Sequence, residues 1–454
     1  MRSYMKLERD LTKGSVVKQL IMFALPFMLS NLIQSFYNVA DMYIVGKFCG
    51  PAGISAVNIG GQVTFLMTNL VVGLCVGGTV IVAQYLGNDR RKEVVECIGT
   101  LLVSLLGAAV VITVVMLFIS TQILNLIQTP EESFAQAREY LDITIMGTLF
   151  IFGYNALSAI MRGIGDSRRP LYFVTIACAL NIVLDYILVG GFGMEAKGAA
   201  IATVFSQGVS MALCVIYLKT HDFVFDFKLK SFRFYPHHFK VLMKVGVPTS
   251  IQNVISNFSF LVLTTIANQF GVAASAGLAV VGKYNGFAIM PTVAVGSSIS
   301  AMAAQNIGAG QLDRAKKTLH TGLLLAYAVS VPIFLLSQLF PEQIIGIFDK
   351  DPAMLEAGAQ YLKSFSFDYL CVALVFCVNG IITGSGHTAF ASISNILSSV
   401  GFRIPMALLF GIVLDGGMRG LGLAAPIASL ATTVLVLIFY FSGRWKVSTI
   451  IKAV

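Results

Sequence analysis

The chain has 454 residues, of which 56% are hydrophobic and only 12% are charged, and its mean hydropathy is +0.82. A water-soluble protein carries about 25% charged residues, so this composition excludes an ordinary soluble globular protein. The net charge of +9 comes mainly from loops on one side of a membrane, and it therefore indicates no nucleic-acid partner.

Uncharged apolar runs of membrane-spanning length, about 20 residues each, recur along the whole chain. They indicate helices rather than the alternating strands of a barrel, because a helix satisfies its own backbone hydrogen bonds in lipid. In chain order they predict twelve helices, near 16–46, 53–80, 94–120, 136–160, 170–190, 198–218, 241–269, 273–301, 314–339, 358–382, 389–413 and 420–442. The sequence therefore predicts an all-α membrane protein. Pro26 and Pro248 fall inside the first and seventh helices, where each predicts a kink.

The distribution of basic residues predicts the orientation. The first apolar run is longer than the core of a signal peptide, so we interpret it as a retained helix. An even number of spans places both termini on one side, and the loops on that side carry most of the Lys and Arg residues. By the positive-inside rule, both termini are predicted to be cytoplasmic, in an inner or plasma membrane that the chain crosses many times.

The two halves of the chain resemble each other at an offset of about 221 residues. The matching pairs are Ala83–Gly87 with Ala304–Gly308, Arg162–Gly165 with Thr383–Gly386, and Pro26 and Asn31 with Pro248 and Asn253. This repeat predicts an N-terminal six-helix bundle at 1–220, a cytoplasmic linker at 221–240 and a C-terminal six-helix bundle at 241–454. Six helices per half give the pseudo-symmetric bundles one orientation, which is typical of transporters that hold substrate near the midplane.

Acidic side chains within apolar helices are costly, so each is a candidate functional residue. Asp41 lies about 9 Å inside the outer end of the first helix, at 1.5 Å per residue. On the same measure Asp185 lies roughly 7.5 Å inside the outer end of the fifth helix, and Thr203 about 9 Å inside that of the sixth. Asn181 precedes Asp185 by one turn and shares its face. These four residues are predicted to meet at one depth.

Two carboxylates with an amide and a hydroxyl suit ion coupling. If the acids approach closely in a dry pocket, one proton or a Na⁺ held by these hard oxygens would relieve their repulsion. The alternative is that each acid only caps or joins helices, and that Asn181 and Thr203 are ordinary polar packing residues. No other cofactor is predicted, and the same oxygens suit H⁺ or Na⁺ equally.

The acidic site is not repeated in the second half. Leu263 stands at the position that matches Asp41, and Met406 at the one that matches Asp185. Charges occur elsewhere, as Lys283, Asp368 and Arg403 in the eighth, tenth and eleventh helices. Either Lys283 and Asp368 form a structural ion pair, or these residues line the substrate cavity and favour an anionic or zwitterionic group.

The first helix carries further polar residues near the predicted kink at Pro26. Gln34, Tyr37 and Asn38 are predicted to line a central cavity, with packing against neighbouring helices as the alternative. Pro26 itself is predicted to act as a hinge.

Several motifs closely resemble those of the multidrug and toxic compound extrusion (MATE) family, and the match covers essentially the whole chain. The motifs are Pro26 with Asn31, Asp41–Gly46, Gly73–Gly78 with Ala83–Gly87, Arg162–Asp166, Asn181–Asp185 with Gly198–Thr203, and Ala304–Gly310. The resemblance implies an antiporter of twelve helices in two bundles around a V-shaped cleft, driven by H⁺ or Na⁺. Members of the archaeal and DinF-like type have an ion site in the N-terminal bundle. The resemblance implies that this site corresponds here to Asp41, Asn181, Asp185 and Thr203.

One departure separates this chain from family members of the NorM type, which also use acids on helices seven and ten. The seventh helix here has no acid, and Asp368 lies about one turn from the position of the helix-ten acid.

The predicted function is secondary export of drugs or other organic compounds, by alternating access of the two bundles coupled to H⁺ or Na⁺. We expect a small-molecule substrate, cationic or zwitterionic, and a monomer in the lipid bilayer. The alternatives are a flippase for lipid-linked oligosaccharide or a metabolite exporter of the same superfamily, and a channel. A membrane-embedded enzyme is not predicted, because all five His lie in or near inside loops and no catalytic constellation appears at membrane depth.

Overall fold

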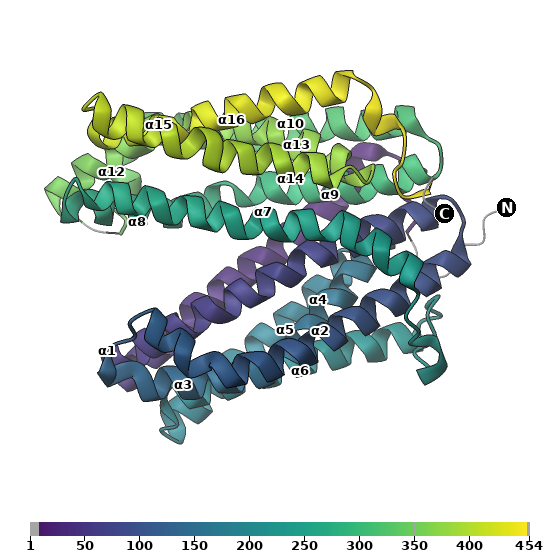
Figure 1. Cartoon of the computed structure of the whole chain (residues 1–454), viewed down its shortest axis with the longest axis horizontal. Coiled ribbons are helices and arrows are strands. Elements are labelled where there is room, and N and C mark those ends of the chain that lie inside the picture. Colours follow the sequence, from purple (N-terminus) through teal and green to yellow (C-terminus); the bar gives the residue numbers. More distant parts are fainter. Residues whose placement is uncertain (1–8, 349, 452–454) are drawn as a thin grey trace. The chain divides into compact units, whose positions relative to one another are not determined.

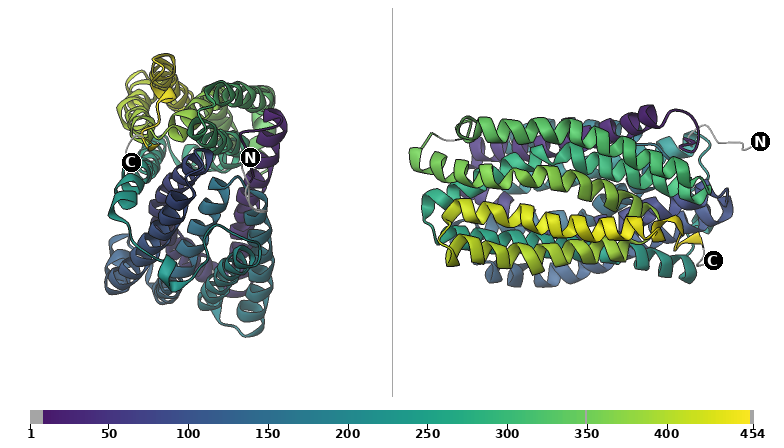
Figure 2. Two further views of the ribbon diagram at one scale, coloured as in Figure 1. Left: turned by 90° about the vertical axis from the view of Figure 1, so that its right-hand side faces the viewer. Right: turned by 90° about the horizontal axis from the view of Figure 1, so that it is seen from above.

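The computed structural model describes residues 9–348 and 350–451, and most of them lie in helices. The helices of the first half are α1 (Val16–Gly87), α2 (Arg91–Leu126), α3 (Glu131–Met146), α4 (Thr148–Gly163), α5 (Arg168–Asp185) and α6 (Glu195–Thr220). Those of the second half are α7 (Pro236–Asn268), α8 (Val272–Ala288), α9 (Met290–Gly308), α10 (Leu312–Leu339), α11 (Pro341–Ile345), α12 (Pro352–Phe365), α13 (Phe367–Gly384), α14 (Thr388–Ile396), α15 (Ile404–Leu408) and α16 (Gly417–Phe441). Within each half, the long helices run side by side (Figures 1 and 2).

The prediction of twelve spans is confirmed. In the described residues, nine helices are long and apolar enough to cross a membrane, and two pairs bent by 49° and 41°, α3–α4 and α8–α9, each supply one more span. The 72-residue α1 counts twice, because Gly50 interrupts it with φ 68° and ψ −162°. A residue with a side chain rarely adopts that left-handed backbone, so glycine suits this sharp turn between the two spans.

Wider π-helical segments interrupt the same helix in each half. In the first half, residues Tyr186–Gly191 continue α5 directly after Asp185. In the second half, Leu397–Arg403 and Leu409–Val413 flank α15. Because π-helical turns occur frequently at functional sites, Asp185, which directly precedes the first segment, and Arg403, the last residue of the second, are of interest.

The chain divides into two compact units. Of the described residues, the first unit holds 29–246 with residues 9 and 10, and the second holds 11–28 and 247–451. The predicted bundles placed 11–28 with the first half. In the structure, Leu11, Val16 and Leu20 belong to a buried cluster with residues of α9, α10 and α13.

Polar contacts also hold the start of the chain in the second unit. The backbone N–H of Leu11 donates to Oε1 of Gln305 at 2.9 Å. The guanidinium of Arg314, at the start of α10, donates to the carbonyl oxygens of Leu11, Lys13 and Gly14 at 2.8 to 3.1 Å. One cation therefore anchors the segment that leads into α1.

Two helices pass from one unit to the other. The border falls between Met28 and Leu29 in α1, and between Gly246 and Val247 in α7. Pro26 and Pro248 lie within two residues of these borders. A proline inside a helix removes one backbone hydrogen bond, so both crossings lie at weakened points. The hinge at Pro26 stays a prediction.

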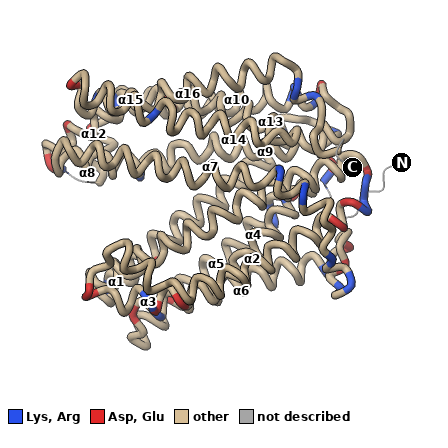
Figure 3. Tube along the Cα trace, in the orientation of Figure 1, with Lys and Arg blue, Asp and Glu red and all other residues tan. Residues whose placement is uncertain are grey.

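Basic residues gather at one end of each unit. In the first unit, Lys and Arg residues lie at the starts of α2 and α5 and at the end of α6 (Figure 3). In the second unit, they lie at the start of α10 and after α16, the end at which the chain terminates. This arrangement matches the loop charges from which a cytoplasmic side was predicted.

Candidate functional site

Three helices of the first unit carry the predicted acidic site. Asp41 lies on the first span of α1, Asn181 and Asp185 lie on α5, and Thr203 lies near the start of α6. Asp41, Asn181 and Asp185 have only 5%, 1% and 0% of their surface exposed. Two acids are thus largely shielded from water inside the helix bundle. Such burial requires a compensating proton, cation or hydrogen-bond network.

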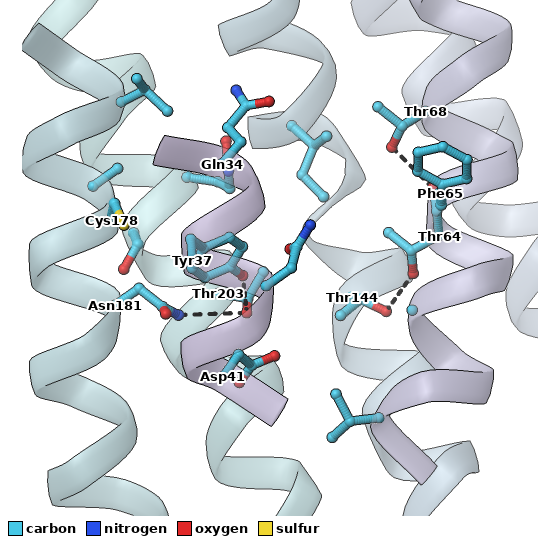
Figure 4. Close-up of a pocket in the computed structure, with 18 of the residues that line it drawn as sticks. Gln34, Tyr37, Asp41, Thr64, Phe65, Thr68, Thr144, Cys178, Asn181 and Thr203 are labelled. Carbon is cyan, nitrogen blue, oxygen red and sulfur yellow. Dashed lines mark hydrogen bonds between the residues drawn. The ribbon is translucent and has the colours of Figure 1, made fainter. Parts of the chain in front are cut away.

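Hydrogen bonds join the three helices at Thr203. The Tyr37 hydroxyl, from α1, shares a hydrogen bond of 2.7 Å with Oγ1 of Thr203, and Asn181 donates its Nδ2 to the same oxygen at 3.5 Å. Figure 4 shows both side chains directed at Thr203, with Asp41 one turn further along α1. The structure therefore brings together the residues that the helical rise per residue predicted at one depth in the membrane. Tyr37, predicted only as a cavity residue, proves to be a direct partner of this site.

Several oxygens of the site have no protein donor. Both carboxylate oxygens of Asp185, Oδ1 of Asp41 and Oδ1 of Asn181 are buried without a hydrogen-bond partner among the described residues. The carboxyl groups of Asp41 and Asp185 are also close enough for their negative charges to repel each other. Buried, partnerless oxygens of this kind suit a proton or a small hard cation.

A cavity of about 480 Å³ opens beside these residues in the first unit. Gln34, Tyr37 and Asn38 line it, and so do Asp41, Asn181 and Thr203. Asp185 does not line the cavity. One carboxylate of the pair thus faces the space and the other lies behind it. The volume lies within the range of pockets that hold drug-sized ligands.

The rest of the cavity wall was not predicted. It is lined from the second span of α1 by Asn58, Gln62, Thr64, Thr68 and Asn69, and from elsewhere by Tyr140, Thr144, Tyr154, Asn155, Ser206 and Gln207. Thr64 and Thr144 share a hydrogen bond of 3.2 Å, which joins α1 to α3. A signal was present in the sequence, since polar residues recur at helical spacing between 58 and 69 within an apolar run.

Tyr140 enters the cavity wall because the facing helix has no side chain there. A Cβ at Gly60 would lie only 2.5 Å from Cδ1 of the Tyr140 ring, so any larger residue would displace the ring. Tyr140 also lies within electrostatic range of Asp41 and Asp185. Its phenol therefore belongs to the surroundings of the acidic pair.

The second unit has no copy of this site. Leu263 and Met406 occupy the matching positions, and Leu263 is buried in an apolar cluster with Met406 packed against it. No group of three or more His, Cys, Asp or Glu side chains that could hold a metal ion occurs in the described part of either unit. A cation at Asp41 and Asp185 would thus be held by two carboxylates with the oxygens of Asn181 and Thr203.

The structure does not show the ion pair between Lys283 and Asp368 that was one of the two predicted alternatives. Lys283 is exposed and forms no ion pair with Asp368 among the residues that the structure describes. Asp368 is 3% exposed and lies within electrostatic range of Arg403. The guanidinium carbon of Arg403 lies 5.0 Å from the centre of the Phe260 ring. Arg403, rather than Lys283, is therefore the cation that offsets Asp368.

Comparisons with known proteins agree with this architecture. The family model described as MatE matches residues 26–187 and 248–409, so that it covers both halves at the offset of the internal repeat. The chain is 29% identical to "Probable multidrug resistance protein YpnP" of Bacillus subtilis, over 96% of this chain and 97% of that protein. It is 23% identical to a protein of Shewanella oneidensis named as an FAD transporter, over 94% of each chain.

Solved structures show the same fold. A MATE crystal structure in the bent conformation has a TM-score of 0.89 at 22% identity, covering 97% of this chain and 98% of that one. An outward-facing multidrug resistance MATE family transporter of the MOP superfamily has a TM-score of 0.87 at 22% identity and the same coverage.

Proposed function

The chain belongs to the MATE (multidrug and toxic compound extrusion) family of membrane transporters, and we propose that it exports small organic molecules by antiport with H⁺ or Na⁺. Members of this family are transporters rather than enzymes, and relatives along the whole chain are named for multidrug resistance. We further propose that the termini face the cytoplasm and that the two helix bundles alternate access.

The observation that carries the proposal is the buried acidic pair beside the cavity. Asp41 faces the cavity and Asp185 lies behind it. Oδ1 of Asp41 and both carboxylate oxygens of Asp185 lack a hydrogen-bond partner among the described residues. A substrate in the cavity and a coupling ion at the pair would therefore both interact with Asp41. Binding of the ion neutralises this carboxylate, which weakens its attraction for a positively charged group of the substrate. Competition at one carboxylate is a direct route to antiport.

The mechanism then needs a change of shape that follows ion binding. Neutralising Asp41 and Asp185 removes their repulsion, so the outer part of α1 and α5 approach each other more closely. Pro26 supplies a weakened point in α1 at which that helix bends. Bending of α1 reduces the cavity beside Tyr37 and Asn38 and displaces the substrate.

Transport in liposomes tests the proposal. The purified full chain is reconstituted with a fluorescent cationic dye, and a pH gradient or a Na⁺ gradient is imposed separately. We expect dye movement against its concentration gradient under one of the two, abolished by an ionophore that dissipates that gradient. Dye flux that is indifferent to both gradients would instead indicate a channel, and movement of a labelled lipid without dye transport would indicate a flippase.

Thr203→Val tests the hydroxyl that joins the three helices. The valine keeps the shape of the side chain but cannot bond to Tyr37 or Asn181, and losing one such buried partner costs about 1–3 kcal/mol. We expect the concentration of driving ion that gives half-maximal export to rise roughly tenfold, since 1.4 kcal/mol is a factor of ten. Thr203→Ser should retain near-normal coupling.

The matched control is Thr175→Val on α5. Thr175 is exposed and its hydroxyl donates only to the backbone of its own helix, to Leu171 O at 2.7 Å. Its ion dependence should be unchanged. Equal effects of the two valine substitutions would argue against a role for Thr203 in ion binding.

A further inference from the structure

A lysine occupies an unusual position in the second unit. Lys283 lies 11 residues after Val272, the first residue of α8, which places it about 16 Å along the helix. The hydrocarbon core of a bilayer is about 30 Å thick, so this ammonium lies near the middle of the membrane. Lys283 is nevertheless exposed. A charge at this depth faces a water-filled space or a protein interior rather than lipid.

The face of α8 that carries Lys283 is open. Its exposed residues are Ala279, Gly282, Lys283, Gly286 and Phe287, at helical spacing, whereas Ala274, Val281 and Ala288 on the other face belong to the buried core. A Cβ placed on Gly282 or on Gly286 would meet no atom within 4 Å. The lysine thus stands between two glycines that leave room for a ligand to approach the helix closely.

The neighbouring turn of α8 is fixed by hydrogen bonds to two other helices. The hydroxyl of Tyr284 shares a hydrogen bond of 3.1 Å with Oγ of Ser337 on α10. The hydroxyl of Tyr369, on α13, donates to Oδ1 of Asn285. These bonds lie one and two residues after Lys283 and hold this turn of the helix in place. A charged group on a fixed helix loses less freedom when it binds a partner than one on a mobile loop.

The other membrane-depth cation of this unit, Arg403, has favourable electrostatic neighbours. Arg403 lies within electrostatic range of Asp368 and over the ring of Phe260. Lys283 has neither arrangement: within the described residues no carboxylate lies within ion-pair distance of its Nζ. Among the described residues of the second unit, Lys283 is therefore a positive charge at membrane depth with no carboxylate beside it, on an open helix face.

We propose that Lys283 binds the carboxylate of exported compounds, so that the transporter favours anionic and zwitterionic molecules that carry one. The inference deepens the proposed export function and rests on it. An ammonium–carboxylate contact is strong where water is sparse, and Lys acts as a compact point charge that requires no fixed ligand geometry. A flat ligand would have space for this contact over Gly282 and Gly286.

Equilibrium binding of two dyes to the detergent-solubilised full chain tests the inference. Rhodamine B carries a free carboxylate, and its ethyl ester has the same ring system without that charge. In Lys283→Gln we expect the Kd for rhodamine B to rise about tenfold or more, as for loss of a charge contact, and the Kd for the ester to change less than about twofold. Lys283→Arg should restore most of the affinity for rhodamine B.

Lys317→Gln is the control, because Lys317 is an exposed lysine on α10 near the basic end of the second unit. It should leave both affinities unchanged. Binding of the ester by Lys283→Gln shows that this variant is folded. An equal change for both dyes, no change for rhodamine B, or no binding of rhodamine B to the unsubstituted chain would each overturn the inference.

The experiment separates this inference from the proposed function. Binding in detergent needs no ion gradient, so a carboxylate preference that depends on Lys283 would stand even if no gradient drove export. Conversely, gradient-driven export of both dyes with no selective effect of Lys283→Gln would support the exporter and reject the carboxylate site.

Discussion

Asp41→Asn and Asp185→Asn are each expected to reduce gradient-driven export roughly 100-fold or more, because a direct ligand of the ion should matter at least as much as outer-shell partners, whose loss costs about 10–100-fold. Asparagine has nearly the same shape as aspartate but cannot take up a proton or contribute a charge to a cation. Both acids are buried, and Oδ1 of Asp41 and both carboxylate oxygens of Asp185 have no hydrogen-bond partner among the described residues, so the substitutions remove few contacts. The proteins should therefore remain folded while coupling is lost.

The two variants should differ in substrate binding. Asp41 lines the cavity and Asp185 does not. Asp41→Asn is thus expected to weaken binding of a cationic dye as well as export, whereas Asp185→Asn should change dye binding less than about twofold. Measuring the dye Kd in detergent beside export in liposomes separates these effects.

Asp313→Asn is the control for the acid substitutions, because its carboxylate is fully exposed at the start of α10 and pairs only loosely with Lys316 at 3.6 Å. Such a surface pair contributes little to stability. Export by Asp313→Asn should equal that of the unsubstituted chain. Undiminished export in both Asp41→Asn and Asp185→Asn would rule out the acidic pair as the coupling site.

Gly380→Val is expected to destabilise the second unit severely. Gly380 on α13 faces α9, where a Cβ would lie 2.6 Å from the carbonyl oxygen of Gly296. One turn further, a Cβ on Gly384 would lie 2.7 Å from the carbonyl oxygen of Ser300. Small residues at this spacing let the backbones of two membrane helices approach each other closely. The contact between α9 and α13 depends on this close approach.

The neighbours of Gly380 cannot easily move, because the obstructing atom is backbone rather than the end of a flexible side chain. Overpacking of this kind typically costs about 1–3 kcal/mol and sometimes more. Thermal unfolding in detergent should begin several degrees lower, with a reduced yield of monodisperse protein. Gly107→Ala on α2, where a Cβ would meet nothing within 4 Å, should unfold like the unsubstituted chain. Equal stability of Gly380→Val would show that α9 and α13 can separate at little cost.

Depth along each helix could be predicted from the sequence, because a helix rises 1.5 Å per residue whatever its neighbours are. That regularity placed Asp41, Asp185 and Thr203 at one level, and the hydrogen bonds among Tyr37, Asn181 and Thr203 occur there. The rotation of each helix about its own axis depends on packing. Sequence reasoning therefore missed that Asp185 lies behind the cavity wall.

Which charged side chains of different helices pair also could not be predicted from the sequence. Lys283 and Asp368 have opposite charges and similar depth, which made an ion pair plausible. In the fold, Asp368 is buried on α13 near Arg403, while Lys283 is on the exposed face of α8. Opposite charges at equal depth pair only if their helices turn the right faces toward each other. No pattern within a single helix carries that information.

The position of residues 11–28 has a consequence for synthesis of the protein. These residues are synthesised before α9, α10 and α13, yet they pack against those helices, which follow hundreds of residues later in the chain. The first unit can collapse as soon as α6 is complete, but the beginning of α1 must wait in the membrane for its partners. A fragment that ends in the loop before α7 would leave the apolar face of Val16, Leu20 and Ala24 without its helices. The order of translation and the order of assembly therefore differ in this chain, and helices of the second unit complete the packing of the beginning of α1.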